Sequence, residues 1–129
     1  MSGRFLLDTN IVIALFQLDV SVQENLAKAE QVFVSSIVVG ELYYGAYRSG
    51  RVAANLARIE EFVAGNIILQ CDVVTAQIYG KVKNSLKLKG RPIPENDIWI
   101  GAIALQHHLT LISRDQHFKE IDGLTVETW

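Results

Sequence analysis

Short apolar runs alternate with longer amphipathic segments along the whole chain. Runs rich in Leu, Ile, Val and Phe predict strands at residues 4–7, 32–34, 67–69, 110–112 and 124–126. Apolar residues that recur every three or four positions predict helices at residues 9–17, 21–29, 36–46, 51–64, 73–89 and 94–107, with a short helical turn at 116–119. Strands that alternate with helices build parallel sheets, so the expected fold class is α/β with a central parallel sheet of four or five strands.

Length and composition are those of one ordinary globular domain. The 129 residues are half hydrophobic and carry a net charge of −2, so we expect a single domain over residues 1–129 and no overall attraction to nucleic acid. The single cysteine, Cys71, can form neither an internal disulfide nor a cysteine-based zinc site. With no secretory signal and no run long enough to span a bilayer, a cytoplasmic protein without membrane contact is expected.

Four acidic residues occupy comparable places relative to the predicted strands. Asp8 and Asp115 follow strands directly, Glu41 lies in a helix that follows a strand, and Asp97 opens a helix. The carboxyl ends of parallel strands are where sites form in such sheets. Four carboxylates converging there would make an oxygen-rich site for Mg²⁺ or Mn²⁺, with all four as candidate catalytic residues and metal ligands.

Each acid also has an ordinary structural explanation. Asp8 and Asp115 suit helix caps or turns, Asp97 suits the positive end of a helix dipole, and Glu41 could face solvent. The common placement of all four favours the site. Small residues at Gly101 and Ala104 follow Asp97 along one helix face, which predicts close packing of that face against the sheet.

Polar residues beside the acids are expected to support them. Thr9, Asn10 and Ser113 could orient water molecules around a bound ion. The three histidines have no spacing typical of a zinc site and are not expected to bind metal. There is no glycine-rich phosphate loop. Asn10 stands where a phosphoaspartate phosphatase needs a second acid, and Arg114 is a poor substitute for the lysine of a receiver domain.

Four sequence blocks resemble PIN-domain ribonucleases, and more closely the VapC-type toxins of bacterial and archaeal toxin–antitoxin pairs. The blocks are Asp8-Thr9-Asn10, the segment 36–42 around Glu41, the segment 96–102 around Asp97, and the segment 111–118 around Asp115. They occur in the family's order and span nearly the whole chain. Ser113 stands where threonine is common and Gly101 where alanine is usual, and the family's fourth acid varies.

This resemblance implies a fold, an activity and partners. The fold is a three-layer α/β/α sandwich. The activity is Mg²⁺- or Mn²⁺-dependent endoribonuclease cleavage, often of structured RNA such as transfer RNA, with no organic cofactor. The partners are the RNA substrate, a cognate antitoxin protein and a second copy of the chain in a homodimer. A PIN-like module that binds RNA or protein without cutting, and a housekeeping nuclease without an antitoxin, are the alternatives.

Basic and aromatic residues are candidates for contact with RNA. The candidate phosphate-binding residues are Arg48, Arg51, Arg114, Lys87 and Lys89. The last two belong to a helix segment without acids that could equally be a solvated surface. Tyr43, Tyr44, Tyr47 and Trp99 could stack on unpaired bases or pack in the core.

Overall fold

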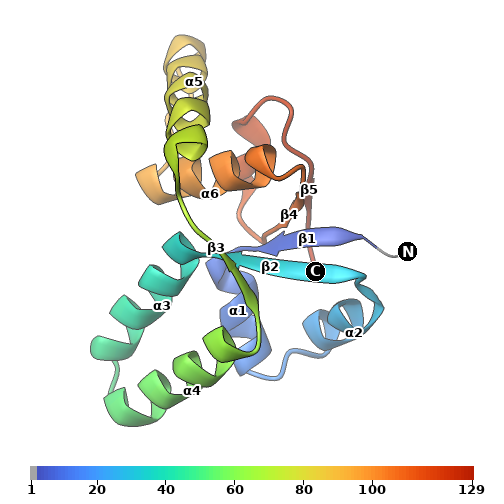
Figure 1. The fold of residues 1–129 in the computed structure, drawn as a ribbon, viewed down its shortest axis with the longest axis vertical. Helices are drawn as coiled ribbons and strands as arrows, with labels where there is room; N and C mark the ends of the chain where they lie inside the picture. The colour runs from blue at the N-terminus through green and yellow to red at the C-terminus, as the bar shows by residue number, and fades with distance from the viewer. Residues whose placement is uncertain (1–2) are drawn as a thin grey trace.

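The computed structural model describes residues 3–129 and has the predicted alternation of strands and helices (Figure 1). The strands are β1 (Arg4–Leu7), β2 (Gln31–Ser35), β3 (Ile67–Leu69), β4 (Thr110–Ile112) and β5 (Val126–Glu127). The helices are α1 (Thr9–Phe16), α2 (Val20–Lys28), α3 (Ser36–Tyr47), α4 (Val52–Ala64), α5 (Val73–Lys89), α6 (Glu95–Gln106) and the short 3-10 helix η1 (Gln116–Glu120).

All five strands are parallel and lie in the order β3-β2-β1-β4-β5. The chain proceeds outward from β1 to β3, then crosses back to the other side of β1 and adds β4 and β5. The strand order therefore reverses between β1 and β4, where Leu6 stands opposite Leu111. In open parallel sheets a ligand site forms outside the carboxyl ends of the strands at such a reversal.

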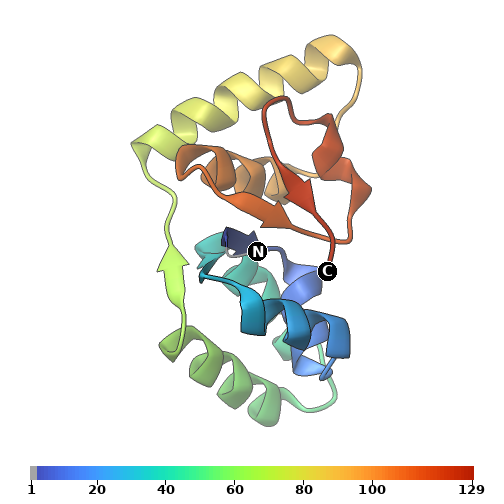
Figure 2. The ribbon, with the colours of Figure 1, turned by 90° about the vertical axis from the view of Figure 1, so that its right-hand side faces the viewer.

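Helices cover both faces of the sheet. Figure 1 shows α5 and α6 on one side and α1 to α4 on the other. In the view turned by 90°, α5 is the outermost helix of its layer and lies over α6 (Figure 2). The fold is a three-layer α/β/α sandwich. Among residues 3–129, no helix has both the length and the apolar character needed to cross a membrane.

The core lies along the central strands and the helices packed on them. Leu6, Leu7, Leu111 and Ile112 are almost wholly buried, as is Ile103 of α6. Strands covered on both faces have no polar side to present, so their sequences are continuous apolar runs. This explains why β1 and β4 read as unbroken hydrophobic segments up to their carboxyl ends.

The helices α5 and α4 end in different ways. Asp72 and Thr75 form a reciprocal capping box at the start of α5, and Gly90 ends that helix in the left-handed conformation (φ 67°). Gly65 at the end of α4 is not left-handed and has φ −95°. It simply extends the last turn of α4, donating its N–H to the carbonyls of Glu61 and Phe62.

The last strand differs from expectation, because it begins at Val126, two residues later than predicted. The helix α6 packs against β4 of the sheet and against η1. A Cβ at Gly101 would lie 2.6 Å from Cδ1 of Ile121, so the missing side chain at Gly101 makes room for the segment that follows η1.

Candidate active site

Asp8 lies at the carboxyl end of β1, at the point where the strand order reverses. Its side chain makes no capping hydrogen bond to α1. Instead, Ser113 Oγ donates to Asp8 Oδ2 at 2.7 Å, and Asp8 is only 5% exposed. The backbone N–H of Asp8 donates to the carbonyl of Ile112 at 2.9 Å, which joins the ends of β1 and β4. Helix capping therefore does not explain this carboxylate.

Glu41 lies in α3 and is half-buried rather than directed to solvent. Thr9 Oγ1 donates to its Oε1 at 2.5 Å, and Asn96 Nδ2 donates to its Oε2 at 3.4 Å. These donors come from α1 and α6, on opposite sides of the sheet. Glu41 therefore bridges the two helical layers at the edge where Asp8 emerges.

Asp97 lies in the first turn of α6, with its side chain 14% exposed. Burial, reinforced by the negative charges of Asp8 and Asp115, raises its pKa from 3.8 to about 6; a hydrogen bond from His117 opposes that shift. The dipole of α6 would lower the pKa of Asp97, which lies in the first turn of that helix. Since the pKa is raised instead, burial outweighs the helix dipole.

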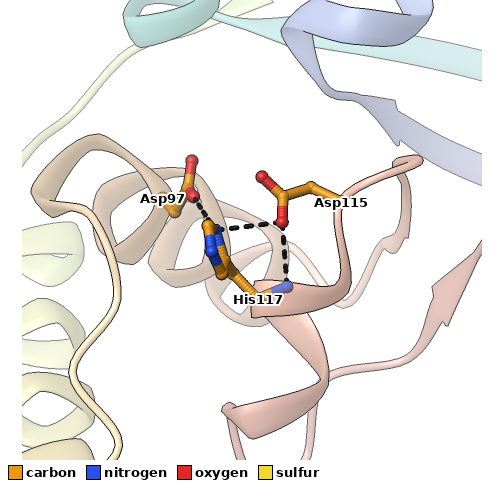
Figure 3. A group of neighbouring side chains, drawn as sticks. All are labelled: Asp97, Asp115 and His117. Atoms are coloured by element: carbon orange, nitrogen blue, oxygen red, sulfur yellow. Dashed lines mark hydrogen bonds and ion pairs between the residues drawn. The ribbon is translucent and has the colours of Figure 1, made fainter.

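Asp115 follows β4 and has two roles. Its Oδ1 accepts the backbone N–H of His117 at 2.9 Å and so begins η1. The same oxygen lies 2.9 Å from His117 Nδ1, and this histidine lies between Asp115 and Asp97 (Figure 3). Asp115 therefore does cap η1, as one explanation from the sequence proposed. Its charge also acts on Asp8 and Asp97.

The four acids influence one another electrostatically. Burial raises the pKa of Asp8, and the charges of Glu41 and Asp115 add to that effect, while the Ser113 hydrogen bond counteracts it. Asp97 responds in turn to the charges of Asp8 and Asp115. The fold gathers Asp8, Glu41, Asp97 and Asp115, named hereafter the carboxylate cluster, at one edge of the sheet. Crowded carboxylates, with the pKa values of Asp8 and Asp97 raised, form a group that a divalent cation would stabilise.

Sequence reasoning missed His117. Its Nδ1 lies 3.3 Å from Asp97 Oδ2 as well as close to Asp115. Ligand atoms of these three residues all lie within 4.8 Å of one another, a spacing that can hold a metal ion. The spacing of the three histidines along the sequence could not reveal a contact between one histidine and two aspartates. The position of His117 two residues after Asp115, in a segment expected to turn, was the available signal.

The three supporting residues each make a hydrogen bond beside the acids. Thr9 Oγ1 donates to Glu41, and Ser113 Oγ donates to Asp8 and accepts the backbone N–H of Asp115 at 3.0 Å. Asn10 Oδ1 accepts the backbone N–H of Arg114 at 3.3 Å. These contacts hold Asp8 and Glu41 in place, and the expected orientation of water by the same three residues stays a prediction.

The basic candidates lie in different surroundings. The Arg114 side chain donates to Asp19 Oδ2 at 3.0 Å and to the carbonyl of Trp129 at 2.9 Å, so it ties the C-terminus to α2. Lys89 binds Asp122 and the carbonyl of Glu120. The remaining three candidates, Arg48, Arg51 and Lys87, are exposed.

The aromatic candidates divide between surface and packing. The Trp99 ring stacks on Tyr79 with centroids 3.9 Å apart, so it joins α6 to α5. Tyr44 and Tyr47 are each 65% exposed. The Arg48 guanidinium lies 5.6 Å above the Tyr44 ring. Of the two exposed tyrosines, Tyr44 is the nearer to Glu41, about one helical turn after it in α3.

Two hollows meet at Glu41. An open groove of about 680 Å³ contains Thr9, Gly40, Glu41, Tyr44 and Asn96 among its lining residues. A smaller pocket of about 270 Å³ lies on the other side, and its walls are mainly apolar side chains of α1, α3 and α4. They include Ile13, Phe16, Leu42, Ala46 and Ile59. Glu41 is a lining residue of both hollows.

Comparisons with known proteins agree with this geometry. The family described as PIN domain matches residues 5–124. Ribonuclease VapC2 of Haemophilus influenzae is 38% identical, and the alignment covers 98% of each chain. The tRNA(fMet)-specific endonuclease VapC of Shigella flexneri is 34% identical over the same share of each chain.

Solved structures show the same fold. The crystal structure of VapBC2 from Rickettsia felis, bound to a DNA fragment from its promoter, contains a chain that superposes with a TM-score of 0.89 at 29% identity, covering 98% of both chains. DNA-bound VapBC from Salmonella typhimurium gives the same TM-score at 30% identity and the same coverage. On this match of sequence, fold and clustered acids, the chain belongs to the PIN-domain family and, within it, to the VapC ribonucleases of toxin–antitoxin systems.

Proposed function

We propose that this ribonuclease is a toxin that hydrolyses RNA phosphodiester bonds at the carboxylate cluster and is held inactive by a cognate antitoxin protein. The observation that carries the proposal is the convergence of Asp8, Glu41, Asp97 and Asp115 from four separate segments on the point where the strand order reverses. An RNA-binding module that does not cut has no need to hold four acids together at a cost in stability.

A divalent cation, Mg²⁺ or Mn²⁺, is the proposed cofactor. The donor set fits such an ion because it is rich in carboxylate oxygens, and burial of Asp8 makes its negative charge costly without a positive partner. Asp8 and Asp97 would be the principal ligands, with Glu41 and Asp115 completing the set. A bound ion at this place supplies positive charge that stabilises the phosphate oxygens and favours ionisation of a water molecule.

The chain's own residues prepare the cluster for this chemistry. Ser113 orients Asp8, and Thr9 orients Glu41. Asn96 lies at the edge of the open groove and binds the second oxygen of Glu41. These contacts fix the carboxylates before RNA arrives, which reduces the ordering that the reaction would otherwise require.

RNA would enter through the open groove beside Glu41. Its phosphates would approach Arg48 and Arg51, and an unpaired base could stack on the exposed ring of Tyr44. Arg114, Lys87 and Lys89 remain candidates for outlying phosphate contacts. Transfer RNA is the first substrate to test, because two VapC relatives are named tRNA(fMet)-specific endonucleases.

The antitoxin would occupy the mainly apolar pocket between α1, α3 and α4. Phe16, Leu42 and Ile59 would bury an apolar segment of the partner, and Arg58 and Glu41 at the walls would provide polar contacts. A partner seated there would lie against Glu41 and block the cluster. A homodimer of the chain is also expected.

The deciding experiment has two parts. Purified protein should cleave transfer RNA in Mg²⁺ or Mn²⁺, and Asp8→Asn should abolish cleavage while its circular dichroism spectrum stays unchanged. Expression in cells should arrest growth, and co-expression of the neighbouring small antitoxin gene should relieve the arrest. Cleavage without growth arrest would identify a housekeeping nuclease, and binding of RNA without cleavage would identify a non-cutting module.

A further inference from the structure

We propose that His117 is a nitrogen ligand of the metal ion at the carboxylate cluster. The resulting mixed oxygen–nitrogen site would bind Mn²⁺ more strongly relative to Mg²⁺ than carboxylates alone would. The inference rests on the proposed function, because it requires that the cluster holds a divalent cation.

The geometry places the imidazole where a ligand is needed. Nδ1 of His117 lies 2.9 Å from Asp115 Oδ1 and 3.3 Å from Asp97 Oδ2 (Figure 3). Adjacent ligands of an octahedral ion bound at about 2.1 Å lie roughly 3 Å apart. The nitrogen therefore stands at the separation of a neighbouring ligand without any change in the backbone.

The local fold holds His117 in this place. The Asp115 carboxylate accepts the backbone N–H of His117, which forces the chain to turn immediately after β4. Phe118 is fully buried and anchors η1, and Ile121 packs against Gly101 of α6, the helix that carries Asp97. The backbone of His117 is thus held between β4 and α6, and its half-exposed imidazole faces Asp97 of α6.

A simple hydrogen bond accounts less well for the same contacts. Nδ1 carries at most one hydrogen, so it cannot donate a well-aligned bond to two carboxylates at once. A cation placed between the three groups satisfies both acids and the nitrogen lone pair together. Imidazole is a favourable ligand for transition metals, whereas Mg²⁺ prefers oxygen, so the nitrogen should favour Mn²⁺.

Pulsed electron paramagnetic resonance of bound Mn²⁺ tests the proposal directly, because a coordinated imidazole gives a ¹⁴N coupling. Untagged wild-type protein would be compared with His117→Ala and with His107→Ala, which removes a histidine at the opposite end of α6. We expect ¹⁴N coupling in wild type and in His107→Ala, and none in His117→Ala. Calorimetry should show the Kd for Mn²⁺ rising roughly tenfold in His117→Ala, while the Kd for Mg²⁺ changes less than about threefold.

The outcomes separate this inference from the proposed function. Bound Mn²⁺ without ¹⁴N coupling in wild type, together with RNA cleavage, would overturn the histidine ligand and leave the nuclease intact. Coupling that persists in His117→Ala would also overturn it. Failure of wild type to bind Mn²⁺ would overturn both. If His117→Ala does not fold, His117→Gln keeps the side-chain size without an imidazole and must give the same loss of coupling.

Discussion

The carboxylate cluster and the surface around α5 are both rich in charged side chains, but acids are paired with lysines around α5 and with other acids in the cluster. Around α5, Lys83 pairs with Glu95 and Lys89 pairs with Asp122, each at 2.9 Å. The hydrogen bond from Tyr79 and the one from Lys83 lower the pKa of Glu95. In the cluster, burial and neighbouring negative charge raise the pKa of Asp97 to about 6.

This contrast distinguishes carboxylates that are stabilised by lysines of the same chain from carboxylates that would be stabilised by a bound cation. Glu95 and Asp122 each have a lysine partner from α5, in the manner of ordinary surface pairs. The cluster instead holds acids against one another, and no lysine or arginine pairs with Asp8, Glu41, Asp97 or Asp115 among residues 3–129. Unfavourable groupings of this kind are typical of functional sites. Four experiments can break or sharpen the comparison.

The largest effect is expected on catalysis. Asp97→Asn should lower RNA cleavage by about 10³-fold, or roughly 4 kcal/mol in activation free energy, because a principal metal ligand loses its charge. Initial rates of cleavage of a labelled transfer RNA measure it. Asp122→Asn is the matched control from the α5 surface and should cut at the wild-type rate. Equal losses in the two variants would remove the distinction between the regions.

Metal binding should have the next largest effect, this time on stability. Saturating Mg²⁺ or Mn²⁺, at about 100 times its Kd, should stabilise the wild type by about 3 kcal/mol and raise Tm by roughly 10 °C. Chelation should reverse the gain. Thermal melts of Asp8→Asn should respond much less to the ion. A full response in Asp8→Asn would place the ion elsewhere.

A smaller effect is expected on the free energy of unfolding of the metal-free protein, measured with a chelator present, as pH changes. Asp97 has a folded pKa of about 6 against 3.8 for the free side chain, so the folded protein binds more protons between these values. The contribution of Asp97 to stability is therefore most favourable below pH 4, is lost as pH rises to about 6, and stays lost above that pH. Asp97→Asn should remove this loss and stabilise the metal-free protein at pH 8 by roughly 1–3 kcal/mol.

Denaturant unfolding at pH 4 and pH 8 checks the sign of this effect. The gain in Asp97→Asn should nearly vanish at pH 4. Asp122→Asn provides a contrast, since the Lys89 contact lowers the pKa of Asp122 and its removal should not stabilise the protein at pH 8. A lower stability of Asp97→Asn than of wild type at pH 8 would contradict the proposed electrostatic strain.

The smallest effect is expected on the surface of α5. Lys83→Ala removes an exposed pair with Glu95, and such pairs contribute little because solvent screens them. Tm should change by less than about 3 °C at physiological salt, and cleavage should be unchanged. A large loss of cleavage in this variant would show instead that α5 contributes to the RNA-binding surface.

Much of the fold could be predicted from residue patterns. The continuous apolar runs at β1 and β4 mark strands covered on both faces, and their carboxyl ends locate Asp8 and Asp115. The capping signals at Asp72 and Gly90 define α5 because they act within a few residues. Local chemistry of this kind is readable without knowledge of the tertiary structure.

Other features depend on contacts between distant segments. Lys89 at the end of α5 pairs with Asp122, and Arg91 just after α5 pairs with Glu120 at the end of η1. No local sequence pattern reveals these partners. The approach of His117 to Asp97 depends on how η1 packs against α6. Sequence periodicity carries no information about such packing.

The hydrogen bond between Asp8 and Ser113 joins positions that are 105 residues apart. During synthesis Asp8 leaves the ribosome early, whereas its partner strand β4 emerges only when most of the chain has been made. Domains acquire their structure as units in step with translation. A nascent chain that lacks β4 therefore has no assembled centre, and the translation machinery is not exposed to a working nuclease until the polypeptide is nearly complete.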